Sequence, residues 1–141
     1  MERLDRGGIM KVLPHRDAML LLDEAALLDD GTATGSYHVR GDEWFLQGHF
    51  PGNPVVPGVI QCEIIAQASC MLLKDAIPGT VPYYAGIDGV RFRRPVRPGD
   101  TLEVRSELVR SKLNLYVVKA EARVEGKLCV SGEFLFMLAK A

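Results

Sequence analysis

The feature that most constrains the fold is one apolar segment that runs from Gly58 to about Ala76. It is too long for an ordinary strand, and it contains no proline or glycine after its first residue. Pro57 precedes it, as a helix start allows, and Pro78-Gly79 follows it, as a helix end requires. Its apolar residues point in nearly every direction around a helix, so the segment is predicted to be a helix buried on most sides.

The second half of the chain predicts half-buried antiparallel strands, because apolar and polar residues alternate there with a period of two. Turn residues at 98–100 and 125–127 separate the alternating stretches. Strands are expected at 83–96, 102–108, 116–124 and 128–138. In the first half we expect a short helix at 9–13, paired strands at 19–28 and 32–39, and a helical turn at 42–46. The predicted fold class is α+β: a curved antiparallel sheet wrapped around one long central helix.

Length and charge limit the classes of function that the chain can serve. Its 141 residues fit a single domain, 1–141, and a net charge of −1 predicts neither a nucleic-acid nor a membrane partner. The longest apolar run is interrupted by two glutamines and a glutamate, so it is too short and too polar to span a bilayer. Cys62 and Cys70 are roughly 12 Å apart along a helix, which is too far for a disulfide. Free buried thiols and the lack of a signal-peptide pattern predict a cytoplasmic protein.

Glu63 needs an explanation, since a carboxylate among isoleucines, valines and alanines is costly to keep ionised. One interpretation is structural: a buried acid held by an arginine or by Gln67, which lies four residues on and shares its helix face. The preceding loop, 48–57, favours a functional interpretation. It is dense in proline and glycine, carries His49, and leads into a helix N-terminus whose free N–H groups can bind an oxyanion. A base, an acid and an oxyanion donor are what removal of a proton beside a carbonyl requires.

Three stretches of the chain resemble signature segments of a known enzyme family. They are LPHRDAMLLLDEA (13–25), GHFPGNPVVPGVIQCEIIAQAS (48–69) and YYAGIDGVRFRRPVRPGD (83–100). In order and spacing they resemble the β-hydroxyacyl-acyl carrier protein dehydratases (FabZ-type) of bacterial type II fatty acid synthesis. The resemblance implies the hot-dog fold, a lyase activity, and acyl carrier protein as the partner that presents the substrate. It also implies a homodimer with shared active sites, commonly assembled further into a trimer of dimers.

The resemblance assigns roles to four residues. His49 is the catalytic histidine, and Glu63 is its partner, contributed by the other subunit. The backbone N–H of Gly58 binds the thioester oxygen, and Gln67 orients Glu63. We expect His49 to act as the base, and Glu63 either to donate a proton or to position the leaving water, because apolar surroundings favour a protonated carboxyl group.

Other residues receive roles by resemblance, with structural alternatives left open. Tyr83 and Tyr84 fall where the family has an aromatic gate near the acyl tunnel, but they are equally explained as strand aromatics in the core. Ile64 and Phe92 are tunnel candidates with the same alternative. The four arginines within seven residues either dock an acidic carrier protein or form a solvated strand face. They are Arg91, Arg93, Arg94 and Arg97.

No cluster of metal-binding residues and no glycine-rich phosphate loop is present in the sequence, so no metal or cofactor is expected. His15 and His38 have no recognisable partner and receive no role in the chemistry. Two stretches depart from the family pattern: Asp17-Ala18-Met19, and Gln61-Cys62, where Gln61 would line the dimer interface or the tunnel.

Two alternative functions share the predicted fold. A hot-dog thioesterase also uses a helix carboxylate, but such hydrolases usually lack the loop that carries His49. A non-catalytic acyl-binding regulator is disfavoured because His49 and Glu63 are both present.

Overall fold

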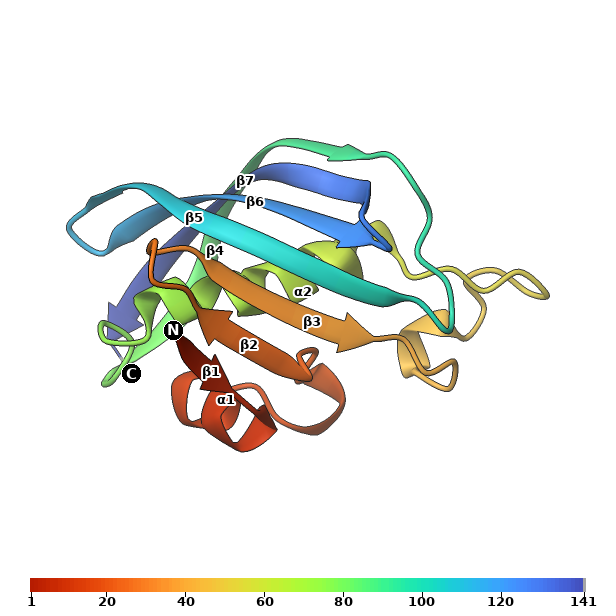
Figure 1. Cartoon of the computed structure of the whole chain (residues 1–141), viewed down its shortest axis with the longest axis horizontal. Coiled ribbons are helices and arrows are strands. Elements are labelled where there is room, and N and C mark those ends of the chain that lie inside the picture. Colours follow the sequence, from red (N-terminus) through yellow and green to blue (C-terminus); the bar gives the residue numbers. More distant parts are fainter. Residues whose placement is uncertain (141) are drawn as a thin grey trace.

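The chain folds as one curved antiparallel sheet around a central helix (Figure 1). In the computed structural model, which describes residues 1–140, seven strands form a sheet in the order β1-β2-β3-β5-β6-β7-β4. The strands are β1 (Glu2–Leu4), β2 (Glu24–Leu27), β3 (Ala33–His38), β4 (Thr80–Phe92), β5 (Thr101–Lys112), β6 (Leu115–Val124) and β7 (Lys127–Lys140). The helices are α1 (Arg6–Val12) and α2 (Gly58–Ser69), with short 3₁₀ turns at Asp17–Met19, Trp44–Leu46 and Cys70–Leu73. The α+β prediction is confirmed.

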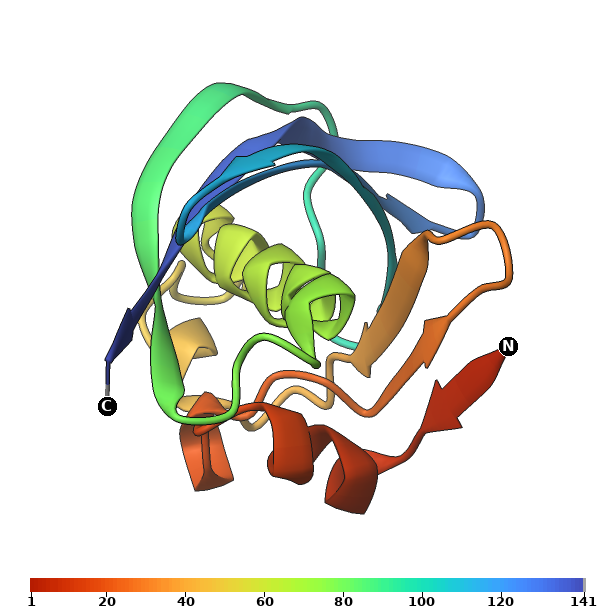
Figure 2. The ribbon, with the colours of Figure 1, turned by 90° about the vertical axis from the view of Figure 1, so that its left-hand side faces the viewer.

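Helix α2 lies inside the curve of the sheet, which bends around it in Figure 2. Nine of its twelve residues are buried, as its all-round apolar pattern predicts. Gly35 of β3 allows the helix to come close: a Cβ at Gly35 would lie 2.7 Å from the Cβ of Ala68. A larger residue at this position would push the helix and the sheet apart, so the core depends on this glycine.

Several elements differ from the predictions. The expected strand at 19–28 is only Glu24–Leu27, because Leu20 to Leu22 enter the core as irregular chain. The Leu21 N–H donates to the Gln67 side chain at 2.8 Å, and this hydrogen bond replaces a sheet partner. The central helix ends at Ser69 and continues as a 3₁₀ turn rather than as α-helix to residue 76. Strand β1 was not predicted.

The segment after β4 also differs, because it leaves the sheet at Phe92 instead of continuing to residue 96. Val96 is fully buried, and its carbonyl accepts a hydrogen bond from the Val56 N–H at 2.8 Å. This contact joins the 48–57 loop to the chain that follows β4. In Figure 1 that loop projects from the right-hand end of the molecule. Among the described residues, no helix combines the length and apolar character needed to cross a membrane.

Candidate active site

The loop that carries His49 is held by its own backbone. The Val55 N–H donates to the His49 carbonyl at 2.8 Å, and Phe50 and Asn53 exchange two backbone hydrogen bonds of 3.1 and 2.9 Å. The Arg97 guanidinium donates to the Asn53 side-chain oxygen at 2.6 Å, which fastens the loop to the chain after β4. The loop therefore presents His49 on a fixed backbone.

The His49 ring has one nitrogen occupied and one free. Its Nδ1 lies 3.0 Å from the Val55 carbonyl oxygen. A carbonyl only accepts hydrogen bonds, so Nδ1 carries the proton and Nε2 keeps a lone pair. The ring is half-buried and stacks on Phe50, with the ring centres 4.3 Å apart. This is the tautomer that a general base requires, with the basic nitrogen turned away from its anchor.

Glu63 is the one residue between Ile60 and Met71 that is not fully buried, and its side chain is 20% exposed. Its Oε2 accepts a hydrogen bond from Gln67 Nε2 at 2.9 Å. The same oxygen lies 3.3 Å from His15 Nε2. The carboxylate is therefore embedded in an apolar helix, as the sequence predicts, but it is held on one side by polar groups.

Gln67 is 1% exposed, and every polar atom of its side chain is used. Its Oε1 accepts from the Leu21 N–H at 2.8 Å, and its Nε2 donates to the Met19 carbonyl at 2.8 Å and to Glu63. The backbone donor and the backbone acceptor fix which way the amide points. Gln67 thus ties Glu63 to the chain between α1 and β2.

His15 is the site residue that sequence reasoning missed. No partner for His15 can be recognised in the sequence, because His15 meets Glu63 only through the tertiary fold. Its position in the first signature stretch, beside Pro14, was the available signal. His38, which was also given no role, is exposed, and its Nδ1 lies 2.9 Å from the Thr101 hydroxyl.

Gly58 is the first residue of α2 and lies against the aromatic ring of Phe92. A Cβ at Gly58 would lie 2.9 Å from Cε1 of the Phe92 ring, so only glycine leaves this ring in place. Pro57 at the N-cap supplies no side-chain hydrogen bond. No acceptor for the Gly58 N–H is found among residues 1–140. The first turn of α2 therefore keeps a backbone donor available.

Tyr84 and Tyr83 of β4 have different surroundings. The Tyr84 hydroxyl donates to the Cys62 carbonyl at 2.6 Å, and its ring stacks on Phe136 with centres 5.5 Å apart. Burial, and then the nearby charge of Glu63, raise the pKa of Tyr84 well above its ordinary value. Tyr83 is 56% exposed. Tyr84 is thus pinned to the helix that carries Glu63, whereas Tyr83 is open to solvent. Ile64 is fully buried in the core.

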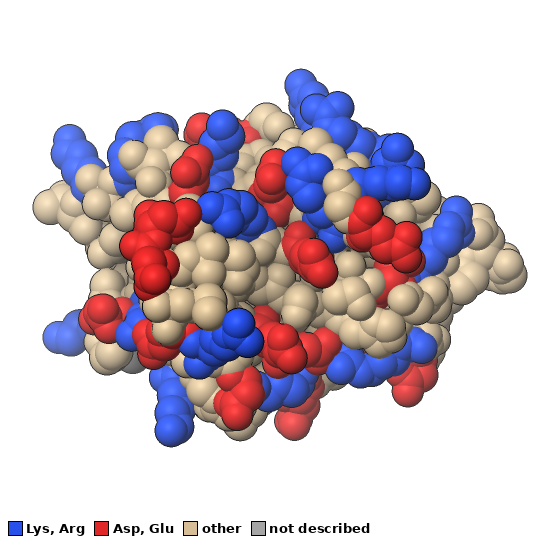
Figure 3. All heavy atoms as spheres, in the orientation of Figure 1, with Lys and Arg blue, Asp and Glu red and all other residues tan. Residues whose placement is uncertain are grey.

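Four arginines lie at the end of β4 and in the chain that follows it, and all four are exposed. Within residues 1–140, none of them forms an ion pair with a carboxylate. They are Arg91, Arg93, Arg94 and Arg97. Elsewhere on the surface, acidic and basic side chains are interspersed, as the face in Figure 3 shows.

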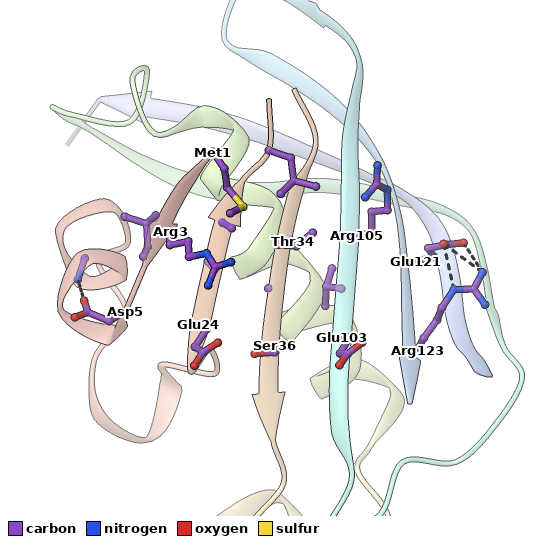
Figure 4. Close-up of a pocket in the computed structure, with 17 residues that line it drawn as sticks. Met1, Arg3, Asp5, Glu24, Thr34, Ser36, Glu103, Arg105, Glu121 and Arg123 are labelled. Carbon is purple, nitrogen blue, oxygen red and sulfur yellow. Dashed lines mark hydrogen bonds and ion pairs between the residues drawn. The ribbon is translucent and has the colours of Figure 1, made fainter. Parts of the chain in front are cut away.

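A hollow of about 820 Å³ lies on the outer face of the sheet, and neither His49 nor Glu63 lines it. Charged side chains of both signs line it, including Arg3, Glu24 and Glu103 in Figure 4. This open, mixed-charge surface has none of the enclosure that a substrate pocket provides. Among the described residues, no group of three or more His, Cys, Asp or Glu side chains is arranged to hold a metal ion.

Within one chain, none of the hydrogen bonds or ion pairs of residues 1–140 joins His49 to Glu63. His49 is bonded to its own loop, and Glu63 to Gln67 and His15. Within residues 1–140 the two side chains therefore have separate bonding partners.

Comparison with known proteins identifies the family of the chain. Residues 13–133 match the FabA-like domain family. A 3-hydroxyacyl-[acyl-carrier-protein] dehydratase FabZ of Caldicellulosiruptor saccharolyticus is 44% identical over 137 residues, which cover 95% of this chain and 98% of the relative. The enzyme of the same name from Albidiferax ferrireducens is 45% identical over 143 residues, 97% of this chain and 95% of the relative.

Solved structures share the hot-dog fold, as predicted. One chain of the dehydratase heterocomplex ApeI:P from Xenorhabdus doucetiae matches with a TM-score of 0.80 at 20% identity, over 94% of this chain and 91% of that one. The PaaI protein of E. coli matches with a TM-score of 0.63 at 18% identity, over 80% of each chain. At these identities the structures establish the fold, whereas the sequence matches establish the family: the chain belongs to the FabZ-type 3-hydroxyacyl-[acyl-carrier-protein] dehydratases.

Proposed function

We propose that this chain reversibly dehydrates β-hydroxyacyl-acyl carrier protein to the trans-2-enoyl product in type II fatty acid synthesis. Relatives that share 40–46% of its sequence over nearly its whole length carry the dehydratase name. The observation that carries the mechanism is the His49 ring. Its Nδ1 proton is donated to the Val55 carbonyl, so Nε2 is a free base in a fixed orientation.

The proposed reaction removes one proton and one hydroxyl group. His49 Nε2 takes the proton from the α-carbon, and the negative charge that develops on the thioester oxygen is stabilised by the Gly58 N–H. The bond between the β-carbon and its hydroxyl oxygen then breaks, the double bond forms, and the hydroxyl leaves as water after receiving a proton. Either Glu63 donates that proton, or Glu63 holds the hydroxyl while His49 returns the proton it took.

The active site is proposed to be shared between two copies of the chain. No hydrogen bond or ion pair within residues 1–140 joins His49 to Glu63, which supports a site in which a second copy supplies the His49 that faces each Glu63. Strand β4 supports this arrangement, because it is a thirteen-residue edge strand with unpaired backbone groups. It also exposes Tyr83, Ile87 and Phe92, each by 45% or more. Pairing of β4 with β4 of a second copy would cover this apolar edge.

The acyl group and its carrier protein are proposed to approach from the side of β4. Tyr83 and Tyr84 are candidates for the gate of the acyl tunnel, since Tyr84 is fixed to the Cys62 carbonyl and Tyr83 is exposed next to it. The exposed arginines 91, 93, 94 and 97 supply positive charge with no carboxylate partner among residues 1–140, which suits an acidic carrier protein. The three cysteines are free and buried, which suits a reducing cytoplasm.

Hydration of a short trans-2-enoyl thioester tests the proposal through loss of its ultraviolet absorbance. The wild type should be active, and His49→Ala should abolish turnover while folding and oligomeric state are kept. If Glu63 donates the proton, Glu63→Gln should be equally inactive. If Glu63 only holds the hydroxyl, Glu63→Gln should keep part of the rate. An inactive but folded wild type on both carrier-bound and coenzyme A substrates would favour an acyl-binding regulator instead.

Mixing the two inactive variants tests whether the site is shared. A dimer of His49→Ala with Glu63→Gln would have one site with both substitutions and one with neither, so random mixing should restore about a quarter of the wild-type rate. No recovery in mixed dimers would place both residues of each site in the same chain. A thioesterase is the alternative enzyme, and release of free thiol from an acyl thioester would reveal it. Thioesterase-like solved structures resemble this chain at 18–23% identity, which is evidence for the fold alone.

A further inference from the structure

We infer that His15 is a positioning residue for Glu63. It donates its Nε2–H to the carboxylate oxygen Oε2, so that the other oxygen, Oε1, holds the proton or the leaving hydroxyl during the reaction. This inference deepens the proposed function and rests on the role of Glu63 there. It starts from one distance, 3.3 Å between His15 Nε2 and Glu63 Oε2, and from the protonation state that the surroundings of His15 allow.

The segment that carries His15 is locked in place. Arg16 donates from its guanidinium to three backbone carbonyls, those of Met10, Leu13 and His15, at 3.0, 2.8 and 2.7 Å. Gln67 holds the far end of the segment through Met19 and Leu21. The His15 backbone is thus fixed on both sides, and its ring faces α2 from a defined position.

The protonation state of His15 follows from its other ring nitrogen. Nδ1 of His15 is buried and has no hydrogen-bond partner among the described residues. A proton on Nδ1 would make this nitrogen a buried donor without an acceptor, which costs free energy. A doubly protonated ring would have the same unpaired Nδ1–H and would carry a charge as well. A neutral ring therefore carries its proton on Nε2, the nitrogen that faces Glu63.

Two donors then meet at the same carboxylate oxygen. Gln67 Nε2 donates to Oε2 at 2.9 Å, and its amide cannot flip because Oε1 of Gln67 is needed by the Leu21 N–H. His15 Nε2 lies 3.3 Å from the same oxygen and is the second N–H group that faces it. Glu63 Oε1 has no partner among residues 1–140. An oxygen that accepts one hydrogen bond and faces a second N–H group is a poor site for the carboxyl proton, so Oε1 is the oxygen that holds the proton or the leaving hydroxyl.

Three variants test this role kinetically. His15→Met removes the donor at similar side-chain volume, and His15→Gln keeps an N–H donor that can neither gain nor lose a proton in the working range. His38→Met is the matched control, since His38 lies outside the site. Removal of a group that orients a reactive side chain typically costs about 10–100-fold. We expect His15→Met to lower kcat at least about tenfold at nearly unchanged KM, and His15→Gln to restore most of the loss.

Two kinetic outcomes would overturn the inference. A wild-type kcat in folded His15→Met would mean that the contact orients nothing. An equal loss in His15→Gln and His15→Met would mean that His15 acts as an acid or base, or only fills space. His38→Met should match the wild type throughout.

A second measurement reads the tautomer directly and does not depend on turnover. The chain has three histidines, so the ¹⁵N ring signals of His15 can be assigned as those missing from the His15→Gln spectrum. The inference requires a neutral ring protonated on Nε2. A neutral ring protonated on Nδ1, or a charged ring at neutral pH, would overturn it. If the wild type proved inactive on every thioester, the proposed function would fail while this measurement still decided the role of His15 as a donor.

Discussion

The substitution Gln67→Leu should cost much more stability than Gln61→Leu, although both glutamines are buried in the same helix. Gln67 is 1% exposed and makes three hydrogen bonds of 2.8 to 2.9 Å. Gln61 is 4% exposed, makes one bond of 3.3 Å to the Val56 carbonyl, and leaves its Oε1 without a partner. The two variants make the same chemical change in different hydrogen-bonding environments.

The magnitude follows from what each change leaves behind. Gln67→Leu strands the Leu21 N–H in the core, which costs about 1–3 kcal/mol, and it removes bonds to Met19 and Glu63 worth about 1 kcal/mol each. The added apolar burial of leucine offsets about 1 kcal/mol of this, so the free energy of unfolding should fall by about 3 kcal/mol. Gln61→Leu removes a weak bond together with an unsatisfied oxygen, so its stability should stay within about 1 kcal/mol of the wild type.

Urea unfolding at one fixed protein concentration measures both changes, because an oligomer has a concentration-dependent stability. The slope of the unfolding free energy against urea should be the same in all three proteins, which would show that the exposed surface has not changed. Equal stability losses in the two variants would contradict this prediction, since they would show that the partners of Gln67 contribute nothing beyond burial. Gln67→Leu should also lower kcat, because Glu63 Oε2 loses the hydrogen bond from Gln67.

Three further predictions follow from the geometry. Gly58→Ala should leave stability almost unchanged, because the exposed Phe92 ring can swing aside, but the methyl group should hinder the oxyanion at the Gly58 N–H and lower kcat by at least about tenfold; full activity would remove Gly58 from the site. The double change Arg93→Glu and Arg94→Glu should raise KM for a carrier-bound substrate, more at low than at high salt, and leave KM for a coenzyme A thioester unaltered; equal effects on both substrates would rule out docking. Burial, and then the charge of Glu63, raise the pKa of the Cys70 thiol from 9.0 to about 12. The folded state therefore holds a proton that the unfolded state releases, so the contribution of this thiol to stability falls as pH rises through that range; Cys70 should resist thiol reagents at pH 8 until the chain is unfolded, and rapid labelling of native protein would contradict this.

Local sequence patterns determined the regular elements. The period of two in the second half specified β5, β6 and β7, because each strand buries one face and exposes the other. The all-round apolar pattern after Pro57 specified α2 and its burial. The apolar run at Leu20 to Leu22 was misassigned to a strand, because burial in the core and pairing in a sheet leave the same apolar signature.

Part of the candidate site also follows from local sequence patterns. Glu63 and Gln67 lie four residues apart on one helix, so their contact follows from the period of the helix alone. His49 and Gly58 were identified by their motif, and local loop geometry explains their hydrogen-bonding state.

The contact between His15 and Glu63 depends on the tertiary fold, because the two residues are far apart in the sequence and approach to 3.3 Å. The periodicity of apolar and polar residues cannot predict a contact between an irregular segment and a helix face. Such contacts arise from packing and not from the repeat of the backbone. The backbone hydrogen bonds of Arg16 and Gln67 fix that packing. Local patterns thus identify the reactive side chains, whereas packing of the irregular segment against α2 gives Glu63 Oε2 its neighbours and leaves Oε1 without a partner among residues 1–140.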